Sequence, residues 1–141
     1  MSTRCQIGFY GNAKEVQLDK PEALIYRHSD GYPEGVLPDI LPFLKIFNEV
    51  RGLADAEYAS ARTLQYLTNL ADEHYEKFKQ NFQSVIQEPN FSGYGICLHG
   101  FHGDIEYYYA IYPNRVDVYE VDFDEKLPIE KRFKKIKTEK I

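Results

Sequence analysis

Apolar and polar positions alternate along two early segments of the chain, which predicts two β-strands. In residues 3–10, one side of the strand carries Cys5, Ile7 and Phe9, and the other side carries Arg4, Gln6 and Tyr10. This period of two is typical of a half-buried strand. Residues 22–28, EALIYRH, form a second such run. The simplest arrangement pairs the two as an antiparallel hairpin with a long connection.

The apolar period changes after Pro33, which predicts helices. Apolar residues then recur at steps of three and four, namely Leu37, Ile40, Leu41, Leu44, Phe47 and Val50. Because Pro42 does not suit a helix interior, we expect a short first turn, a restart near Pro38 and an end at Gly52. A second helical stripe begins after Asp55, a candidate N-cap, and continues to Pro89.

The remaining body of the chain reads as a meander of three strands, over residues 94–99, 104–112 and 115–121. A turn centred between Phe101 and His102 would set His99 opposite Asp104. One face is then apolar and is expected to take the helices: Ile96, Leu98, Ile105, Tyr107, Tyr109, Ile111, Val116 and Val118. The other face collects Cys97, His99, Asp104, Glu106, Tyr108, Arg115, Asp117 and Tyr119. That face is either solvated or covered by a ligand, a second subunit or the C-terminal segment.

These elements predict an α+β fold, with an antiparallel sheet of about five strands. The two helical segments lie between strands 2 and 3 and pack on one face. Residues 1–123 are expected to form a single domain of this kind. Residues 124–141 are expected to form a basic amphipathic tail, with apolar residues at the spacing of a short helix.

Charge is divided unevenly along the chain. Residues 126–141 hold seven Lys or Arg and two acids, a net of +5, which leaves ten bases against twenty acids, or −10, for residues 1–125. An acidic body argues against general binding of duplex DNA. No apolar run approaches the roughly 20 residues of a membrane helix, and the start MSTRCQIGFY lacks a signal-peptide core, so we expect a cytoplasmic protein. Two cysteines make no disulfide framework.

The segment IYRHSDGYPEG, residues 25–35, concentrates candidate chemistry at a strand-to-helix turn. Arg27 beside the free N–H groups of a helix start could hold a phosphate or carboxylate. Asp30 and Gly31 could equally form only a turn. Adjacent side chains point in different directions and no G-x-S-x-G elbow is present, so His28, Ser29 and Asp30 are not a hydrolase triad.

The turn HGFHGD, residues 99–104, supplies the second polar group. His99 opposite Asp104 is an acid/base candidate, and the alternative is a surface hydrogen bond. His102 is either exposed or directed into a pocket. Cys97, His99 and His102 have zinc-ligand side chains, but a second ligand pair is missing, so we expect no metal and no cofactor. The sequence also lacks the common nucleotide-binding and zinc-protease motifs.

Four stretches together resemble a family of small uncharacterised prokaryotic and viral proteins: STRCQIGFY, YRHSDGYPEG, ARTLQYLTNL and GYGICLHGFHGDIEYYY. The resemblance covers residues 2–112 and leaves the tail outside. It implies no activity and carries over no functional residue. It favours a cytosolic, non-secreted setting.

The leading hypothesis is a site for a small phosphate-bearing ligand, such as a nucleotide, where the RHSDGYP loop meets the HGFHGD turn. The expected catalytic residues, should the ligand be hydrolysed by a phosphodiesterase-type reaction, are His28, His99, His102 and Asp104. The expected ligand-binding residues are Arg27, Asp30, Tyr32, Glu106 and Tyr108. The alternative is a non-catalytic interaction protein that forms a homo-oligomer or docks a partner through its Tyr-rich sheet face and basic tail.

Overall fold

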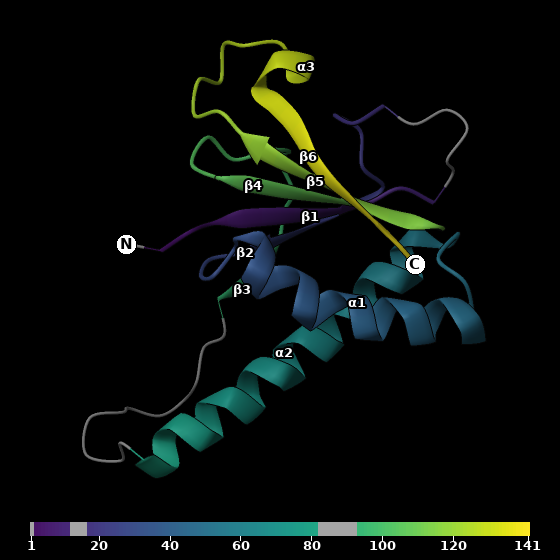
Figure 1. Cartoon of the computed structure of the whole chain (residues 1–141), viewed down its shortest axis with the longest axis vertical. Coiled ribbons are helices and arrows are strands. Elements are labelled where there is room, and N and C mark those ends of the chain that lie inside the picture. The colour runs from purple at the N-terminus through teal and green to yellow at the C-terminus, as the bar shows by residue number, and fades with distance from the viewer. Residues whose placement is uncertain (1, 12–16, 82–92) are drawn as a thin grey trace.

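One six-stranded sheet with two helices on one face organises the chain (Figure 1). The computed structural model describes residues 2–11, 17–81 and 93–141. The strand order is β3-β2-β1-β4-β5-β6. The strands are β1 Cys5–Phe9, β2 Ala23–Arg27, β3 Tyr94–Ile96, β4 Tyr107–Tyr112, β5 Arg115–Val121 and β6 Phe133–Lys140. The helices are α1 Pro33–Val50, α2 Ala56–Asn81 and α3 Ile129–Arg132.

The predicted α+β class is confirmed, and so are two of the predicted hairpins. β1 and β2 pair antiparallel with Ile7 opposite Ile25. β4 and β5 pair antiparallel with Tyr109 opposite Val118. The sheet is mixed, because β1 and β4 are parallel, and it has six strands where about five were expected.

Helix α1 is continuous from Pro33 to Val50, so the expected restart near Pro38 is wrong. Pro38 and Pro42 both lie inside the helix on its exposed side. The carbonyls that lose their amide partners there are near the solvent, while the opposite side is held in the core by Val36, Ile40 and Leu44. After the helix, Gly52 adopts a φ of 84°, a left-handed conformation that favours glycine at a helix end.

Helix α2 begins as predicted after Asp55. The Tyr58 backbone N–H donates to Asp55 Oδ1 at 3.1 Å, which is the N-cap hydrogen bond. The helix runs to Asn81, and Figure 1 shows its far end extending past the sheet. The last part of the predicted stripe, up to Pro89, lies outside the described residues. Among the described residues, no helix is both long enough and apolar enough to span a membrane.

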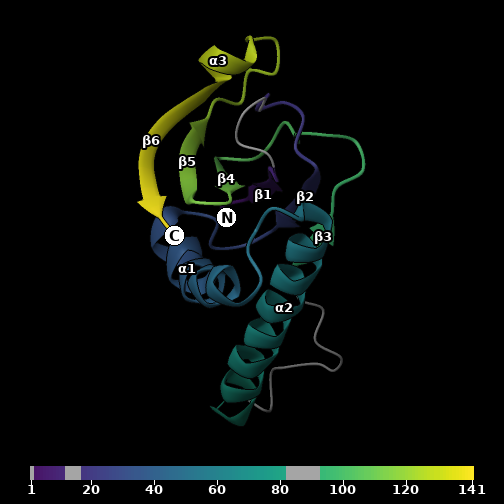
Figure 2. The ribbon, with the colours of Figure 1, turned by 90° about the vertical axis from the view of Figure 1, so that its right-hand side faces the viewer.

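The predicted hairpin between residues 94–99 and 104–112 is wrong, because β3 pairs with β2 rather than with β4. The chain then crosses over β2 and β1 to reach β4, and β4 pairs in parallel with the edge of β1 that β2 does not occupy. The crossing segment, residues 97–106, lies on the sheet face away from α1 and α2 (Figure 2). Ile96 lies opposite Ile25 on the helix side of the sheet, but Ile96 and Leu98 are 70% and 80% exposed, so the expected burial of these two side chains is wrong. His99 is not paired with Asp104 across a hairpin.

Each face of the sheet carries its own apolar core. The helix-covered core contains Cys5, Ile7, Phe9, Ile25, Tyr109, Ile111, Val116 and Val118 from the strands. The second core contains Tyr10, Leu24, Ile105, Tyr108, Ala110, Tyr112, Tyr119, Val121 and Phe133. Ile105 therefore packs on the face opposite to the predicted one. The Tyr-rich face is covered by the crossing segment and by the C-terminal part of the chain itself.

The C-terminal segment forms a strand where a short amphipathic helix was expected. Only Ile129–Arg132 are helical, and Phe133–Lys140 pair antiparallel with β5. A bulge leaves Ile136 between the paired Lys135 and Lys137. Phe133 contacts the rings of Tyr108 and Tyr119, so the segment buries aromatic surface of the sheet.

Candidate functional site at one end of the sheet

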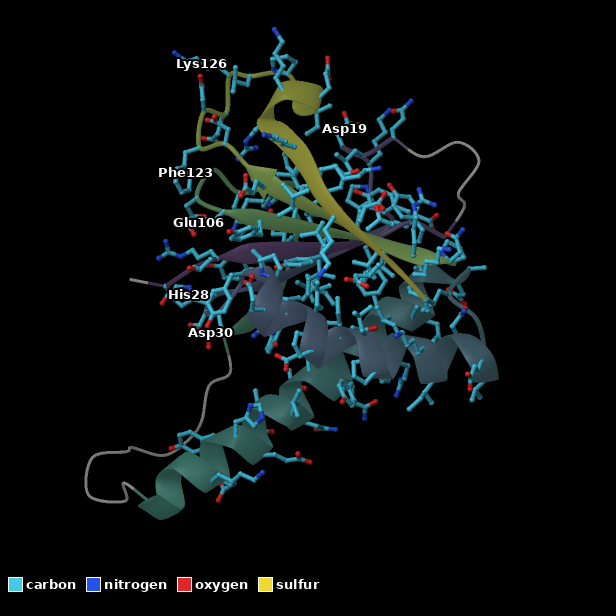
Figure 3. The ribbon with its side chains drawn as sticks, in the orientation of Figure 1. Asp19, His28, Asp30, Glu106, Phe123 and Lys126 are labelled. Atoms are coloured by element: carbon cyan, nitrogen blue, oxygen red, sulfur yellow. The ribbon has the colours of Figure 1, made fainter. Side chains whose placement is uncertain are left out.

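The end of β2 distributes its polar side chains to both faces of the sheet. Leu24 belongs to the second core and Ile25 to the helix-covered core, so alternation directs Tyr26 and His28 away from the helices and Arg27 toward them. Figure 3 shows His28, Asp30 and Glu106 at the same end of the sheet. The two loops that the sequence connects to function therefore meet at this end, but Arg27 lies on the other face from His28.

We call five side chains at this end of the sheet the open-face cluster: Arg4 directly before β1, Tyr26 in β2, His28 directly after β2, and His102 and Asp104 in the crossing segment. The Tyr26 ring lies 4.9 Å from the His102 ring and 6.1 Å from the His28 ring, between centroids. Tyr26 Oη is 2.9 Å from His28 Nδ1. Arg4 Nη1 is 3.4 Å from Asp104 Oδ2. One aromatic ring thus contacts two imidazoles, next to an ion pair.

The protonation of His28 is constrained by these neighbours. Arg4 Nε donates to His28 Nδ1 at 3.5 Å, and because an arginine has no acceptor, Nδ1 must accept. The neutral imidazole then carries its proton on Nε2. Burial raises the pKa of the Tyr26 phenol, so this group stays a neutral donor. Arg4 and Tyr26 therefore both orient the His28 ring through its Nδ1.

The crossing segment is fixed to the sheet by a buried amide. Gln6 is fully buried, and its Oε1 accepts a hydrogen bond from the His102 backbone N–H at 3.0 Å. Its Nε2 donates to the Gly100 carbonyl at 3.2 Å and to Cys97 Sγ at 3.0 Å. From the other side, Arg132 donates to the His102 carbonyl at 2.8 Å. The position of His102 thus depends on contacts far away in the sequence.

Arg27 occupies a separate environment on the helix side. Its Nη1 donates to Asp39 Oδ2 at 2.8 Å and to the Tyr94 hydroxyl at 3.1 Å, and its Nε donates to the Ser29 carbonyl at 2.8 Å. Burial would lower the pKa of Arg27, but Tyr94 and Asp39 outweigh burial and raise it. The residue is 8% exposed and borders a cavity of about 210 Å³ together with Asp30 and His74. Arg27 therefore bears a salt bridge that limits its use for an external anion.

The Asp30-Gly31 turn is dictated by close packing. Asp30 has a φ of 54°, which an aspartate tolerates better than most residues. The Gly31 N–H donates to the Thr3 carbonyl at 2.9 Å, and the buried Tyr109 hydroxyl donates to the Gly31 carbonyl at 2.6 Å. A Cβ on Gly31 would lie 2.9 Å from the Cβ of Cys5. The turn therefore has a structural function of its own.

The other predicted site residues are not all part of the open-face cluster. Tyr32 is the N-cap of α1, and its hydroxyl donates to Asp30 Oδ1 at 3.3 Å. His99 is exposed in the crossing segment. The backbone of Glu106 forms two hydrogen bonds: its N–H donates to the Arg4 carbonyl, and its carbonyl accepts from the Val121 N–H. Tyr108 is fully buried in the second core, so its side chain has no surface for a ligand.

Sequence reasoning missed Arg4, Tyr26 and Gln6 as parts of the site. A signal was available, because the alternation of residues 3–10 places Arg4 and Gln6 together on the side opposite the core residues Cys5 and Ile7. The crossing of the chain over that side is what brings these residues to His102.

Neither metal-ligand geometry nor similarity to known proteins adds to this description. Among residues 2–11, 17–81 and 93–141, no group of three His, Cys, Asp or Glu side chains is placed to hold a metal ion. No protein-family model, curated protein or solved structure matches the chain.

Proposed function

We propose that the chain binds a small phosphate-bearing ligand, such as a nucleotide, at the open-face cluster. The observation that carries the proposal is the contact of Tyr26 with both His28 and His102, which joins the two loops. Two histidines and an arginine at one surface supply donors for phosphate oxygens. Protonation of either imidazole adds positive charge beside the Arg4–Asp104 pair.

The cluster also offers aromatic surface for the rest of a nucleotide. Tyr26 and His102 have ring faces of the kind on which a base stacks. Arg27 is held by Asp39 on the other sheet face, so we assign the anion-binding role to Arg4. Asp104 then keeps the Arg4 side chain extended toward His28.

A hydrolytic function uses the same residues in defined roles. His102 would take a proton from a water molecule that attacks the phosphorus of a diester, and protonated His28 would give the proton on its Nε2 to the leaving oxygen as the P–O bond breaks. Arg4 would stabilise the negative charge that develops on the phosphoryl oxygens. Binding does not require this step, so the two are tested separately.

Binding is tested by isothermal titration calorimetry with a set of nucleoside monophosphates, diphosphates and cyclic monophosphates. We expect saturable binding of at least one, weakened about tenfold or more by Arg4→Ala or His28→Ala, which corresponds to about 1.4 kcal/mol. Arg62→Ala is the matched control, because Arg62 is exposed on α2 and donates to Gln65. Failure of every nucleotide to bind rejects the proposed function.

Hydrolysis is tested with bis-(p-nitrophenyl) phosphate and with the nucleotide that binds best. A reaction supported by this site should be lost in both His28→Ala and His102→Ala and kept in His99→Ala. Nucleotide binding without hydrolysis would show that the protein binds the ligand and that His28 and His102 have no catalytic role. An activity that survives the loss of both His28 and His102 would belong elsewhere.

A further inference from the structure

Strand β6 is at the end of the strand order, and no strand among residues 2–11, 17–81 and 93–141 pairs with its outer backbone edge. The Ile141 N–H donates to the Asn114 carbonyl at 3.1 Å, and Glu139 and Lys137 follow in the same register opposite Val116 and Val118. Backbone groups alternate in direction along an antiparallel strand, so Thr138 and Lys140 direct theirs away from β5. Such an edge can accept a further strand.

An apolar groove borders this edge on the helix side. It has a volume of about 350 Å³ and lies between α1 and the end of β6, lined mainly by Leu37, Pro38, Leu41 and Pro42. Lys137 and Glu139 form its wall on β6. Figure 2 shows β6 descending from α3 to the C-terminus beside α1. A strand added to β6 would direct every second side chain toward this groove.

The exposed side chains of the edge are strongly basic. Lys134, Lys135, Lys137 and Lys140 are all exposed on one strand of eight residues. Lys135 contacts the buried Asp117 at 3.3 Å and Lys137 contacts Glu139 at 2.9 Å. The acidic remainder of the chain, at −10 for residues 1–125, does not favour nucleic acid. The local charge at β6 therefore selects an acidic polypeptide.

The same charges disfavour self-association through this edge. Two copies of β6 paired with each other would bring lysines opposite lysines, which destabilises a strand pair. Edge lysines commonly protect a sheet against unspecific pairing. The same lysines would attract an acidic strand. They can therefore both prevent pairing of two β6 strands and select an acidic partner.

We propose that β6 binds an extended acidic segment of a partner protein as a seventh strand. The backbone groups of Thr138 and Lys140 pair with the incoming segment, and its apolar side chains enter the groove beside Leu37 and Leu41. Its acidic side chains on the alternate positions lie on the other face and contact Lys135 and Lys140. This interaction is independent of the open-face cluster, which lies at the opposite end of β5 and β6 from Thr138 and Lys140.

The test is a titration of the full chain with a capped peptide of alternating Glu and Val, followed by NMR of the backbone amides. We expect shifts in β6 and along the groove, and at least tenfold weaker binding when Lys replaces Glu in the peptide. Thr138→Pro removes an outward N–H and should weaken binding about tenfold. Thr138→Val is its matched control, because it also loses the hydroxyl bond to Asp117 but keeps the N–H.

Lys140→Glu provides a second variant on an exposed side chain, should Thr138→Pro fail to fold. This variant should bind the Glu peptide more weakly and the Lys peptide more tightly than the native sequence does. Equal binding of the two peptides, or equal binding by Thr138→Pro and Thr138→Val, would overturn the proposal. So would a single-stranded RNA oligonucleotide that shifts β6 at lower concentration than the Glu peptide, or a dimer formed through β6 without peptide.

Discussion

The Gln6 side chain holds the His102 backbone, with Gln6 Oε1 and the His102 N–H 3.0 Å apart. This bond joins β1 to a segment ninety-six positions later in the sequence. Because the amide also bonds to the Gly100 carbonyl, it satisfies two backbone groups of the crossing segment. Gln6 is thus a positioning residue for the open-face cluster.

We expect Gln6→Leu to loosen the crossing segment before it unfolds the protein. The variant leaves the His102 N–H and the Gly100 carbonyl without their partner, a loss of about 1–3 kcal/mol for a group that stays buried. Amide hydrogen exchange at His102 should accelerate, with a smaller change in the strands. Gln65→Leu, on the exposed side of α2, is the control. Unchanged exchange at His102 would contradict this role of Gln6.

The Tyr108 side chain lies over Gly8 and leaves no room for a larger residue there. A Cβ at Gly8 would overlap the Tyr108 hydroxyl, which is hydrogen-bonded to Tyr10 in the second core. Gly8→Ala should therefore lower the free energy of unfolding by about 1–3 kcal/mol or more. The loss should be smaller in a Tyr108→Phe background, where the overlapping oxygen is absent. A double-mutant cycle by urea denaturation measures this coupling, and strict additivity would rule it out.

The Arg27–Asp39 ion pair is expected to stabilise the helix side of the sheet end. Removing only the carboxylate, in Asp39→Ala, leaves a guanidinium that is 8% exposed without its charged partner. The expected loss is about 3–5 kcal/mol. Arg27→Met combined with Asp39→Leu should cost less than Asp39→Ala alone, because no charge remains. Urea denaturation of the three proteins checks the order, and a double variant less stable than Asp39→Ala would contradict it.

Cys5 should make the protein less stable in alkali. Burial raises the pKa of its thiol from 9.0 to about 12, although Arg27 acts in the opposite direction. A raised pKa means that the unfolded chain loses its proton first, so stability is complete below pH 9.0 and falls as pH rises toward about 12. The slope due to this thiol is about 1.4 kcal/mol for each pH unit.

The comparison that isolates this effect is Cys5→Ala. Its free energy of unfolding should be lower near neutral pH, because a buried side chain is truncated, yet fall less steeply above pH 9.0 than that of the native sequence. Urea denaturation at a series of pH values gives both slopes. Parallel curves would show that the thiol is not protected in the folded chain.

The sequence predicted elements whose partners are local. Alternation and period located β1, β2, β4, β5 and both long helices, and the turn at residues 113–114 gave the β4–β5 register. It could not reveal that β3 pairs with β2, because a Gly-flanked turn suits a hairpin and a crossing segment equally well. Ile96 and Leu98 are apolar and were therefore expected in the core. Their exposure follows from the place of β3 at the edge of the sheet.

The candidate site was predictable in its location and less so in its members. The meeting of the RHSDGYP loop with the HGFHGD turn is observed through Tyr26, His28 and His102. Arg27 was assigned to the same site, but the alternation of β2 directs it to the other face. The role of Arg4 depends on Asp104, which lies one hundred positions away and is placed by the long crossing. Contacts of that range carry no local signal.

The most direct measurement of the central proposal is NMR of the imidazole side chains during titration with the best-binding nucleotide. Both His28 and His102 signals should shift with one common dissociation constant, while the exposed His74 on α2 should stay unchanged. In the Arg4→Ala variant, the same shifts should require at least tenfold more nucleotide. Saturable binding that leaves both His28 and His102 signals in place would contradict the proposed site.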